Sequence, residues 1–372
     1  MGEELRRVQE SMKVSRLVLP VAFGLMGFAG GRGAVPIHAQ SEALSAPAFH
    51  HLHMNSPNPS AAINQLLKTY PASTKVTFAG FEGLETANNV YMLFTKVNAR
   101  PPAPGPDRVT AQAPQTAFWH HVWAAKDGRA ALKALRDADP QFGAAKIIPQ
   151  YTGPEGGKVD FSSDTISGFL TTKELEDARQ RGAQPAHRGG YFNWYGPDGV
   201  VMETTDGPDE GYTIVGMFQE QPYCALFWYR KHLNAPDRQP GGRGAPPAGL
   251  RGASQPTGPA SEAGCKVSRG SEASWPSTYK RGHHRVPPPQ LVVFGAVTLR
   301  WYMNQEERPL VGTRGQLMDH IALSVNDLEA WVAKLKSENV KFLLQPYTLG
   351  DTRAAMIEGP SLEAIELVER KP

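Results

Sequence analysis

The chain has little cysteine and almost no excess of charge, and both absences narrow what it can be. Only two of its 372 residues are cysteine, which excludes a disulfide framework and a cysteine-rich zinc module. The 39 basic and 36 acidic residues nearly balance, so no basic surplus points to a nucleic-acid partner. The 40% of apolar residues is enough for real cores, and the length favours two domains over one.

The N-terminal part also lacks an apolar run long enough to span a bilayer comfortably. The run Leu17–Ala29 has 13 residues, with basic residues before it and small residues after it. This anatomy predicts a signal peptide within residues 1–40, recognisable over about 12–40, and a secreted or periplasmic protein without stable membrane insertion. An uncleaved anchor is the alternative. Outside the cytoplasm Cys224 and Cys265 could pair, and the sequence leaves this open.

One order of elements recurs along the chain. In the last copy, alternation over residues 319–325 predicts a strand, and apolar residues at i, i+3, i+4 and i+7 from Leu328 predict an amphipathic helix. Three further strand candidates follow, separated by turn residues, which gives the order β-α-β-β-β. Similar orders begin at Phe49, Phe118 and Tyr212, so the sequence contains four copies.

Two stretches interrupt these copies. The second copy carries an insertion at about residues 152–190, and a Pro- and Gly-rich stretch at about 235–290 interrupts the third. We expect the latter to be a poorly ordered loop, because it lacks apolar periodicity and would gain too little burial to offset its ordering entropy. Pairing the copies in chain order predicts two domains, at 46–210 and 211–372.

A histidine opens the first strand of several copies, and a glutamate ends the pattern Gly-Pro-x5-Glu at Glu203 and Glu366. Together with the repeated unit, these residues resemble the vicinal oxygen chelate superfamily, which includes glyoxalase I, extradiol dioxygenases, and bleomycin and fosfomycin resistance proteins. The resemblance implies an α+β fold of four βαβββ modules, paired into two half-open barrel domains. It also implies a divalent metal inside a barrel and a small-molecule substrate.

Alignment of the copies at their helix starts gives the positions where this superfamily holds its metal. The first-strand positions are His51, His121, Ile214 and His320, and the last-strand positions are Leu93, Glu203 and Glu366. The resemblance therefore predicts a metal site of His51, His121 and Glu203. A weaker second site would consist of His320 and Glu366.

Two histidines and one carboxylate leave coordination positions open, which suits Fe2+, Mn2+ or Zn2+ without deciding between them. Leu93 cannot bind a metal, so the set resembles that of the ring-cleaving dioxygenases more than that of glyoxalase I. Those enzymes usually keep the metal in the second pair of modules, whereas here the complete set falls in the first.

Four residues are candidates for the chemistry or for contact with the substrate. Side-chain alternation places His53 on the same face as His51, as a substitute ligand, a general base or a hydrogen-bond partner of the substrate. Glu203 would be catalytic through the metal that it holds. Trp123 and Tyr195 are candidates for lining the substrate cavity, although core packing is the commoner role of tryptophan.

Two main classes of function fit these observations. The first is a secreted metal-dependent enzyme, dioxygenase-like or glyoxalase-like, that acts on a small molecule with vicinal oxygens. The second is a non-catalytic protein that sequesters a small planar molecule, as bleomycin resistance proteins do; a structural protein with a relict site is a third. Convergent ligands favour the enzyme, because a pure binder has no need of them. The substrate stays open, and so does the oligomeric state, including a homodimer.

Overall fold

The computed structural model describes residues 44–101, 115–139, 192–236, 261–266, 286–304 and 309–370, together with the short strands at 147–148, 151–152 and 157–158. The predicted signal peptide and most of the two predicted insertions lie outside the described residues. Within the described ranges, no helix is long and apolar enough to cross a membrane.

The first and fourth modules have the predicted order β-α-β-β-β. Module 1 comprises β1 (Ala48–Ser56), α1 (Pro59–Thr69), β2 (Thr74–Phe78), β3 (Phe81–Glu85) and β4 (Tyr91–Lys96). Module 4 comprises β14 (Met318–Val325), α6 (Leu328–Ser337), β15 (Phe342–Leu349), β16 (Thr352–Glu358) and β17 (Ala364–Glu369). Their helices begin where Asn58 and Asp327 accept hydrogen bonds from backbone N–H groups of the first turn.

The second and third modules carry the interruptions. Module 2 comprises β5 (Phe118–Ala125), α2 (Gly128–Ala138), β6 (Ile147–Ile148), β9 (Phe192–Tyr195), the short helix η1 (Pro197–Gly199) and β10 (Val201–Asp206), with the hairpin β7 (Tyr151–Thr152) and β8 (Gly157–Lys158) in its insertion. Module 3 comprises β11 (Gly211–Gln219), α5 (Pro222–Leu233), η3 (Glu262–Gly264), β12 (Val286–Phe294) and β13 (Val297–Met303). In the described part of module 3, two strands instead of three follow helix α5.

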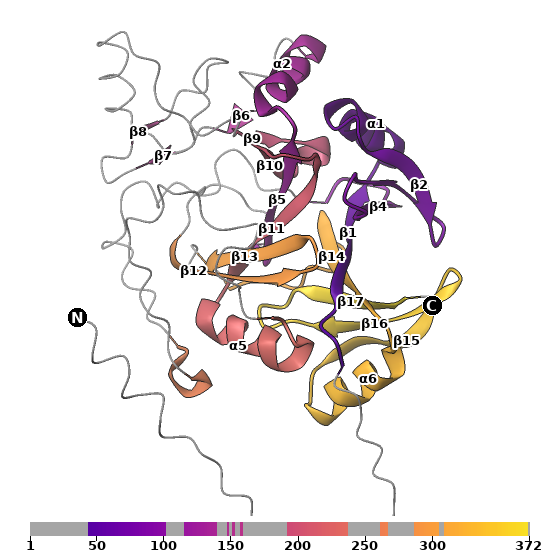
Figure 1. Ribbon diagram of the computed structural model, residues 1–372, viewed down its shortest axis with the longest axis vertical. Coiled ribbons are helices and arrows are strands. Elements are labelled where there is room, and N and C mark those ends of the chain that lie inside the picture. Colours follow the sequence, from indigo (N-terminus) through magenta and orange to yellow (C-terminus); the bar gives the residue numbers. More distant parts are fainter. Residues whose placement is uncertain are drawn as a thin grey trace, which may run out of the picture. The chain divides into compact units, whose positions relative to one another are not determined.

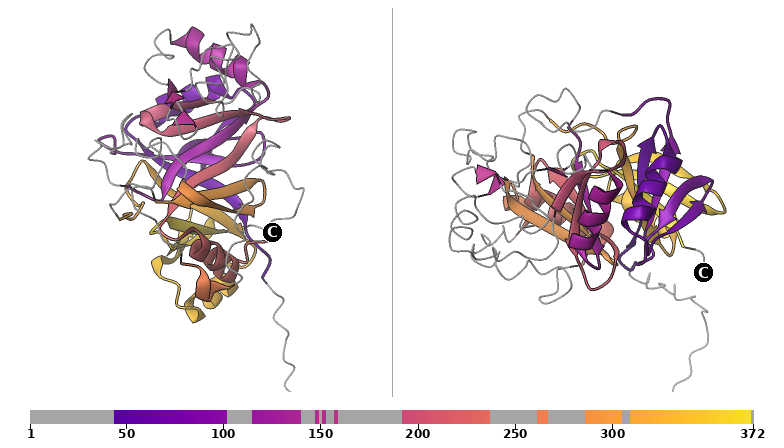
Figure 2. Two further views of the ribbon diagram at one scale, coloured as in Figure 1. Left: turned by 90° about the vertical axis from the view of Figure 1, so that its left-hand side faces the viewer. Right: turned by 90° about the horizontal axis from the view of Figure 1, so that it is seen from above.

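The strands form two large sheets, and these correct the predicted pairing of modules. One sheet has the order β15-β16-β17-β14-β1-β4-β3-β2, so it joins module 4 to module 1. The other has the order β12-β13-β11-β5-β10-β9-β6, so it joins module 3 to module 2. In the right-hand view of Figure 2, indigo strands accordingly lie with yellow ones, and magenta strands with orange ones. The ranges 46–210 and 211–372 therefore do not each contain one sheet.

Modules that are neighbours in the sequence contact each other through their helices instead. Helix α1 contacts α2 (Figure 1). Lys334 of α6 donates hydrogen bonds to main-chain carbonyls at the end of α5. Tyr70, directly after α1, stacks on Trp123 of β5 with ring centroids 4.3 Å apart. Its hydroxyl is 2.8 Å from the hydroxyl of Thr204 in β10. Module 1 is therefore packed on module 2 without sharing a sheet with it.

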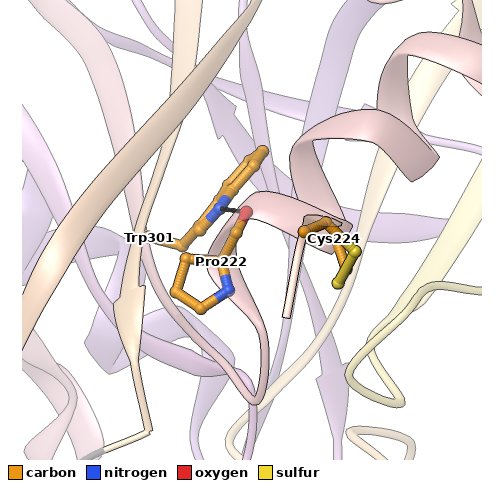
Figure 3. Close-up of a disulfide and its surroundings, with 4 residues drawn as sticks. Pro222, Cys224 and Trp301 are labelled. Atoms are coloured by element: carbon orange, nitrogen blue, oxygen red, sulfur yellow. Dashed lines mark hydrogen bonds between the residues drawn. A yellow bond between two sulfur atoms is a disulfide. The ribbon is translucent and has the colours of Figure 1, made fainter. Parts of the chain in front are cut away.

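The two cysteines form a disulfide, which answers a question that the sequence left open. Cys224, in the first turn of α5, is bonded to Cys265, directly after η3 (Figure 3). The same end of α5 is held by Trp301, whose Nε1 donates to the carbonyl oxygen of Pro222 at 3.0 Å. Residues 261–266 of the predicted loop are thus tied to module 3, and residues 237–260 and 267–285 lie outside the described residues.

Removal of this disulfide should destabilise the protein without unfolding it. We expect the double variant Cys224→Ser/Cys265→Ser to lose about 2–4 kcal/mol of unfolding free energy, because the bond closes a long loop and restricts the unfolded chain. The sequence separation of the cysteines is 41 residues. Urea denaturation, with the reduced wild-type protein as control, measures the loss. An unchanged midpoint would show that the bond contributes nothing to stability.

Candidate metal centre

A cavity of about 250 Å³ lies against the sheet of modules 1 and 4. Its polar lining comes from strands β1, β4, β14, β15 and β17 and from the segment before β14. Phenylalanine, leucine and methionine side chains line the remainder. Three strands in the middle of the sheet, β17, β14 and β1, are neighbours and supply its histidines and its buried glutamate.

Three polar atoms in this cavity converge without hydrogen-bond partners. Nε2 of His51 lies 3.5 Å from Oε2 of Glu366, and Nε2 of His320 lies 3.8 Å from the same oxygen. All three atoms are buried, and none has a hydrogen-bond partner among the described residues. Ligands that each bind one ion at about 2.0–2.2 Å must lie within about 4.4 Å of each other. Both histidine–glutamate separations are therefore compatible with a shared divalent ion.

A third histidine lies beside this set. His51, His53 and His320 each offer a nitrogen, and these nitrogens lie within 4.8 Å of one another. The ring of His53 stacks on that of His320 with centroids 4.7 Å apart. Its Nε2 is 2.7 Å from the hydroxyl of Thr95. His53 thus lines the cavity as predicted, and the hydrogen bond to Thr95 of the neighbouring strand β4 fixes its ring.

Strand register brings these side chains together. In the antiparallel pair of β1 and β14, His53 lies opposite His320 and His51 lies opposite Ala322. Ala322 is in turn paired with Glu366 of the parallel neighbour β17. An irregularity in β1 between Phe49 and His51 adds one residue to that strand, so Phe49 belongs to the core while His51 faces the cavity.

His320 is held from its second nitrogen by a carboxylate. Its Nδ1 lies 2.6 Å from Oδ1 of Asp319. The Asp319 carboxylate also accepts hydrogen bonds from Nη1 of Arg314, from the backbone N–H of Gly315 and from the side chain of Asn55. A metal-binding histidine commonly donates its other N–H to such an acceptor, which fixes the tautomer that leaves Nε2 free.

The other two candidate ligands have partners of different kinds. Nδ1 of His51 lies 2.8 Å from Nδ1 of His50, its neighbour in the irregular part of β1. The hydroxyl of Tyr347 donates to Oε1 of Glu366, which leaves Oε2 for the cavity. Each of the three residues is thus oriented by a contact on the side away from the point of convergence.

Burial sets the protonation states of these groups. It lowers the pKa of His51 well below the usual 6.5, and the neighbouring His50 and His320 add repulsion. Burial, with His320 nearby, lowers the pKa of His53 to about 3. Burial also raises the pKa of Glu366 above its usual value. Uncharged imidazoles are the form that binds a metal, so no proton has to leave His51 or His53 at neutral pH.

The structure corrects the predicted grouping of His51, His121 and Glu203. His51 lies in the sheet of modules 1 and 4, whereas His121 and Glu203 lie in the other sheet. His121 is fully buried in the core, stacked on Tyr212, and its Nδ1 accepts a hydrogen bond from Trp123. The group that does form combines His51 with the two residues of the predicted weaker site, His320 and Glu366.

In module 2 the equivalent of His51 is His120 rather than His121. Nε2 of His120 is 3.5 Å from Oε2 of Glu203, which repeats the contact between His51 and Glu366. The sequence contained the signal for this assignment, because the histidine precedes the N-cap residue of its helix by seven positions in modules 1, 2 and 4. These pairs are 51 and 58, 120 and 127, and 320 and 327.

Trp123 and Tyr195 do not line the cavity. Trp123 packs in the core between Tyr70 and Tyr212, and Tyr195 belongs to β9 in the sheet of modules 2 and 3. The aromatic lining comes from Phe78, Phe81 and Tyr347 instead. Sequence reasoning missed Tyr347 and Asp319, since neither occupies a position that the repeat marks as a ligand.

The architecture of paired βαβββ modules is that of the vicinal oxygen chelate fold, as the sequence predicted. Neither a scan against protein-family models nor a search of curated proteins finds a match. Among solved structures, glyoxalase I from Zea mays is similar at 13% identity and a TM-score of 0.49, over 87% of this chain and 92% of that one.

Two further solved structures match with lower TM-scores. A putative dioxygenase from Bacillus subtilis is 10% identical over 89% of this chain and 87% of that one, with a TM-score of 0.46. The fosfomycin resistance protein FosX from Listeria monocytogenes, in a complex with Mn(II), is 9% identical over 43% of this chain and 90% of that one, with a TM-score of 0.26.

The core position of His121 has a consequence for acid stability. Burial, and secondarily His120, lowers the pKa of His121 to about 3, so between this value and 6.5 the unfolded chain binds a proton at His121 that the folded chain does not. Stability should therefore fall as the pH drops below 6.5. His121→Asn, whose amide oxygen can replace Nδ1 as acceptor for Trp123, should make this fall shallower by up to about 1.4 kcal/mol per pH unit. Urea denaturation between pH 4.5 and 7.5 tests this; parallel curves would contradict it.

The contact between His50 and His51 should matter for metal affinity. The His50→Phe variant keeps a ring of similar volume but loses the nitrogen that can accept a hydrogen bond from Nδ1 of His51. We expect its affinity for a divalent metal to fall about 10- to 100-fold. Titration calorimetry with Zn2+ measures the affinity. His50→Gln, which keeps an acceptor oxygen, should recover part of the loss. Equal affinities of His50→Phe and the wild type would show that the contact does not support the ligand.

Proposed function

We propose that this protein is a secreted or periplasmic metal-dependent enzyme that acts on a small molecule with two vicinal oxygens. The observation that carries the proposal is the convergence of three buried, unpartnered atoms, Nε2 of His51, Nε2 of His320 and Oε2 of Glu366. Burying such atoms without partners costs folding free energy, so their persistence favours a role in binding a cation.

The chemistry of the donor set suits Fe2+, Mn2+ or Zn2+. A bound ion of this kind supplies Lewis acidity, which polarises oxygens bonded to it and stabilises negative charge on them. His51, His320 and Glu366 would hold the ion, and three ligands would leave coordination positions for a substrate.

Leu93 lies where a fourth ligand would come from module 1. It is paired with His53 in the parallel ladder of β1 and β4, and it lines the cavity with an apolar side chain. Coordination positions left open in this way suit a bidentate substrate together with another small ligand. This favours a dioxygenase-like reaction over a glyoxalase-like one.

The other polar residues of the cavity would orient the substrate. His53 is stacked on His320 and bonded to Thr95, so its ring is positioned to form a hydrogen bond with a substrate oxygen. Phe78, Phe81 and Leu344 would cover the apolar faces of the substrate and exclude water from it.

Two observations support the extracytoplasmic location. The sequence over about residues 12–40 has the parts of a signal peptide. The disulfide between Cys224 and Cys265 is of a kind that persists in oxidising compartments and is rare in the cytosol.

The pair Glu366 and Glu203 offers a matched test, because the two residues occupy equivalent positions in the two sheets. Glu366→Gln removes a charged oxygen with little change of volume, and it should weaken Zn2+ or Mn2+ binding at least 10-fold and abolish turnover. Glu203→Gln should leave both nearly unchanged. Calorimetry and metal analysis of the full chain measure the first effect. Screening of catechols and 2-oxoaldehyde thiol adducts, with bleomycin for binding alone, measures the second.

The opposite pattern, in which only Glu203→Gln loses the metal, would overturn this assignment of the site. Metal binding accompanied by tight bleomycin binding and no turnover of any compound would instead favour a sequestering protein of the bleomycin resistance type.

A further inference from the structure

We propose that Arg314 forms a subsite for an anionic group of the substrate, so that the cavity selects molecules with vicinal oxygens at one end and a carboxylate at the other. This inference rests on the proposed function, because it assumes that a metal held by His51, His320 and Glu366 binds the vicinal oxygens of the substrate.

Arg314 differs from every other described residue that lines the cavity, because it carries the one permanent positive charge there. It lies just before β14, and 47% of its side chain is exposed, which places the guanidinium between the cavity and solvent. An incoming anion can therefore reach it without displacing another part of the chain.

The guanidinium is fixed in place before any ligand arrives. Nη1 of Arg314 donates to Oδ1 of Asp319. It also lies 2.9 Å from Nδ1 of His320, which donates to the same carboxylate and therefore does not accept from the guanidinium. The second oxygen of Asp319 accepts from the backbone of Gly315 and from Asn55, so the carboxylate is held on several sides. Guanidinium has five N–H donors, and these contacts use Nη1 only. Nη2 and Nε have no hydrogen-bond partner among the described residues.

The charges of the site leave room for one more negative charge. Asp319 and Glu366 each contribute −1 and Arg314 contributes +1, while histidines that bind a metal through Nε2 are neutral. A divalent ion makes the total +1. A partly buried site with an uncompensated charge is unfavourable, and an anionic substrate would compensate it better than a neutral one.

The geometry places the two ends of such a substrate on opposite sides of His320. Nε2 of the ring faces Glu366 and Nδ1 faces Arg314, so the imidazole ring and the 2.9 Å contact at Nδ1 separate Nε2 from the guanidinium. Phe81 and Tyr347 line the same cavity with aromatic surface. A planar molecule with two adjacent hydroxyls and a carboxylate across the ring fits this arrangement.

Catechol and 3,4-dihydroxybenzoate are suitable probes, because they differ only in the carboxylate. Calorimetry with the Zn2+-loaded full chain should show that the wild type binds the acid at least about 10-fold more tightly, as expected for a charge-assisted hydrogen bond. In Arg314→Gln this preference should disappear, while the affinity for catechol changes less than about 3-fold. Arg314→Lys should keep part of it.

Controls separate this role from a merely structural one. Arg353→Gln removes an exposed arginine of β16, outside the cavity, and should keep the full preference. If Arg314 only held Asp319 and His320 in place, Arg314→Gln would weaken Zn2+ and both probes equally, and the preference would survive. That outcome, or equal binding of the two probes by the wild type, overturns the subsite. Failure of the Zn2+-loaded protein to bind either probe overturns the proposed function and the subsite with it.

Discussion

The candidate site depends on the antiparallel pairing of β1 with β14. These strands come from opposite ends of the described chain, and they lie side by side in the middle of the eight-stranded sheet. Because side chains alternate along a strand, the pairing that puts His53 opposite His320 also determines which histidines face the cavity. A shift of the β14 register by one residue would turn His320 toward the core and remove it from the cavity.

This buried polar group is stabilised by a shell of contacts that point away from the cavity. Asp319 orients His320, Tyr347 orients Glu366, and His50 lies against His51. Within this group, Nε2 of His51, Nε2 of His320 and Oε2 of Glu366 have no hydrogen-bond partner among the described residues. Natural proteins rarely leave buried polar atoms unsatisfied, and the exceptions gather where a ligand completes the set. The arrangement thus lowers the stability of the folded protein somewhat, and it leaves a preformed binding site.

The second sheet shows how the same fold can lack such a site. His120 and Glu203 repeat one histidine–glutamate contact of the first sheet. In the second sheet His120 is paired with Gly216, whereas in the first sheet the equivalent His320 is paired with His53. A β-carbon at Gly216 would lie only 2.0 Å from the His120 ring. The His120 ring therefore occupies space that His53 and the cavity occupy in the first sheet. Module 3 contributes Ile214 at the position of His51, so the second sheet has no second histidine there.

The sequence by itself determined the modules. The order β-α-β-β-β follows from local periodicity and N-cap residues, which act over a few positions, and the fold class followed from it. It also marked His51, His53, His320 and Glu366 as residues of interest. The seven-residue distance to the N-cap would further have separated His120 from His121.

Only the tertiary structure decided which modules share a sheet, and with that which marked residues meet. All four first strands present similar patterns and each needs a neighbour, so local sequence does not distinguish their partners. The choice depends on packing between distant segments, such as Tyr70 of module 1 on Trp123 of module 2, which leaves β1 to pair with β14. Such contacts depend on the shape of the assembled core, which no window of neighbouring residues contains.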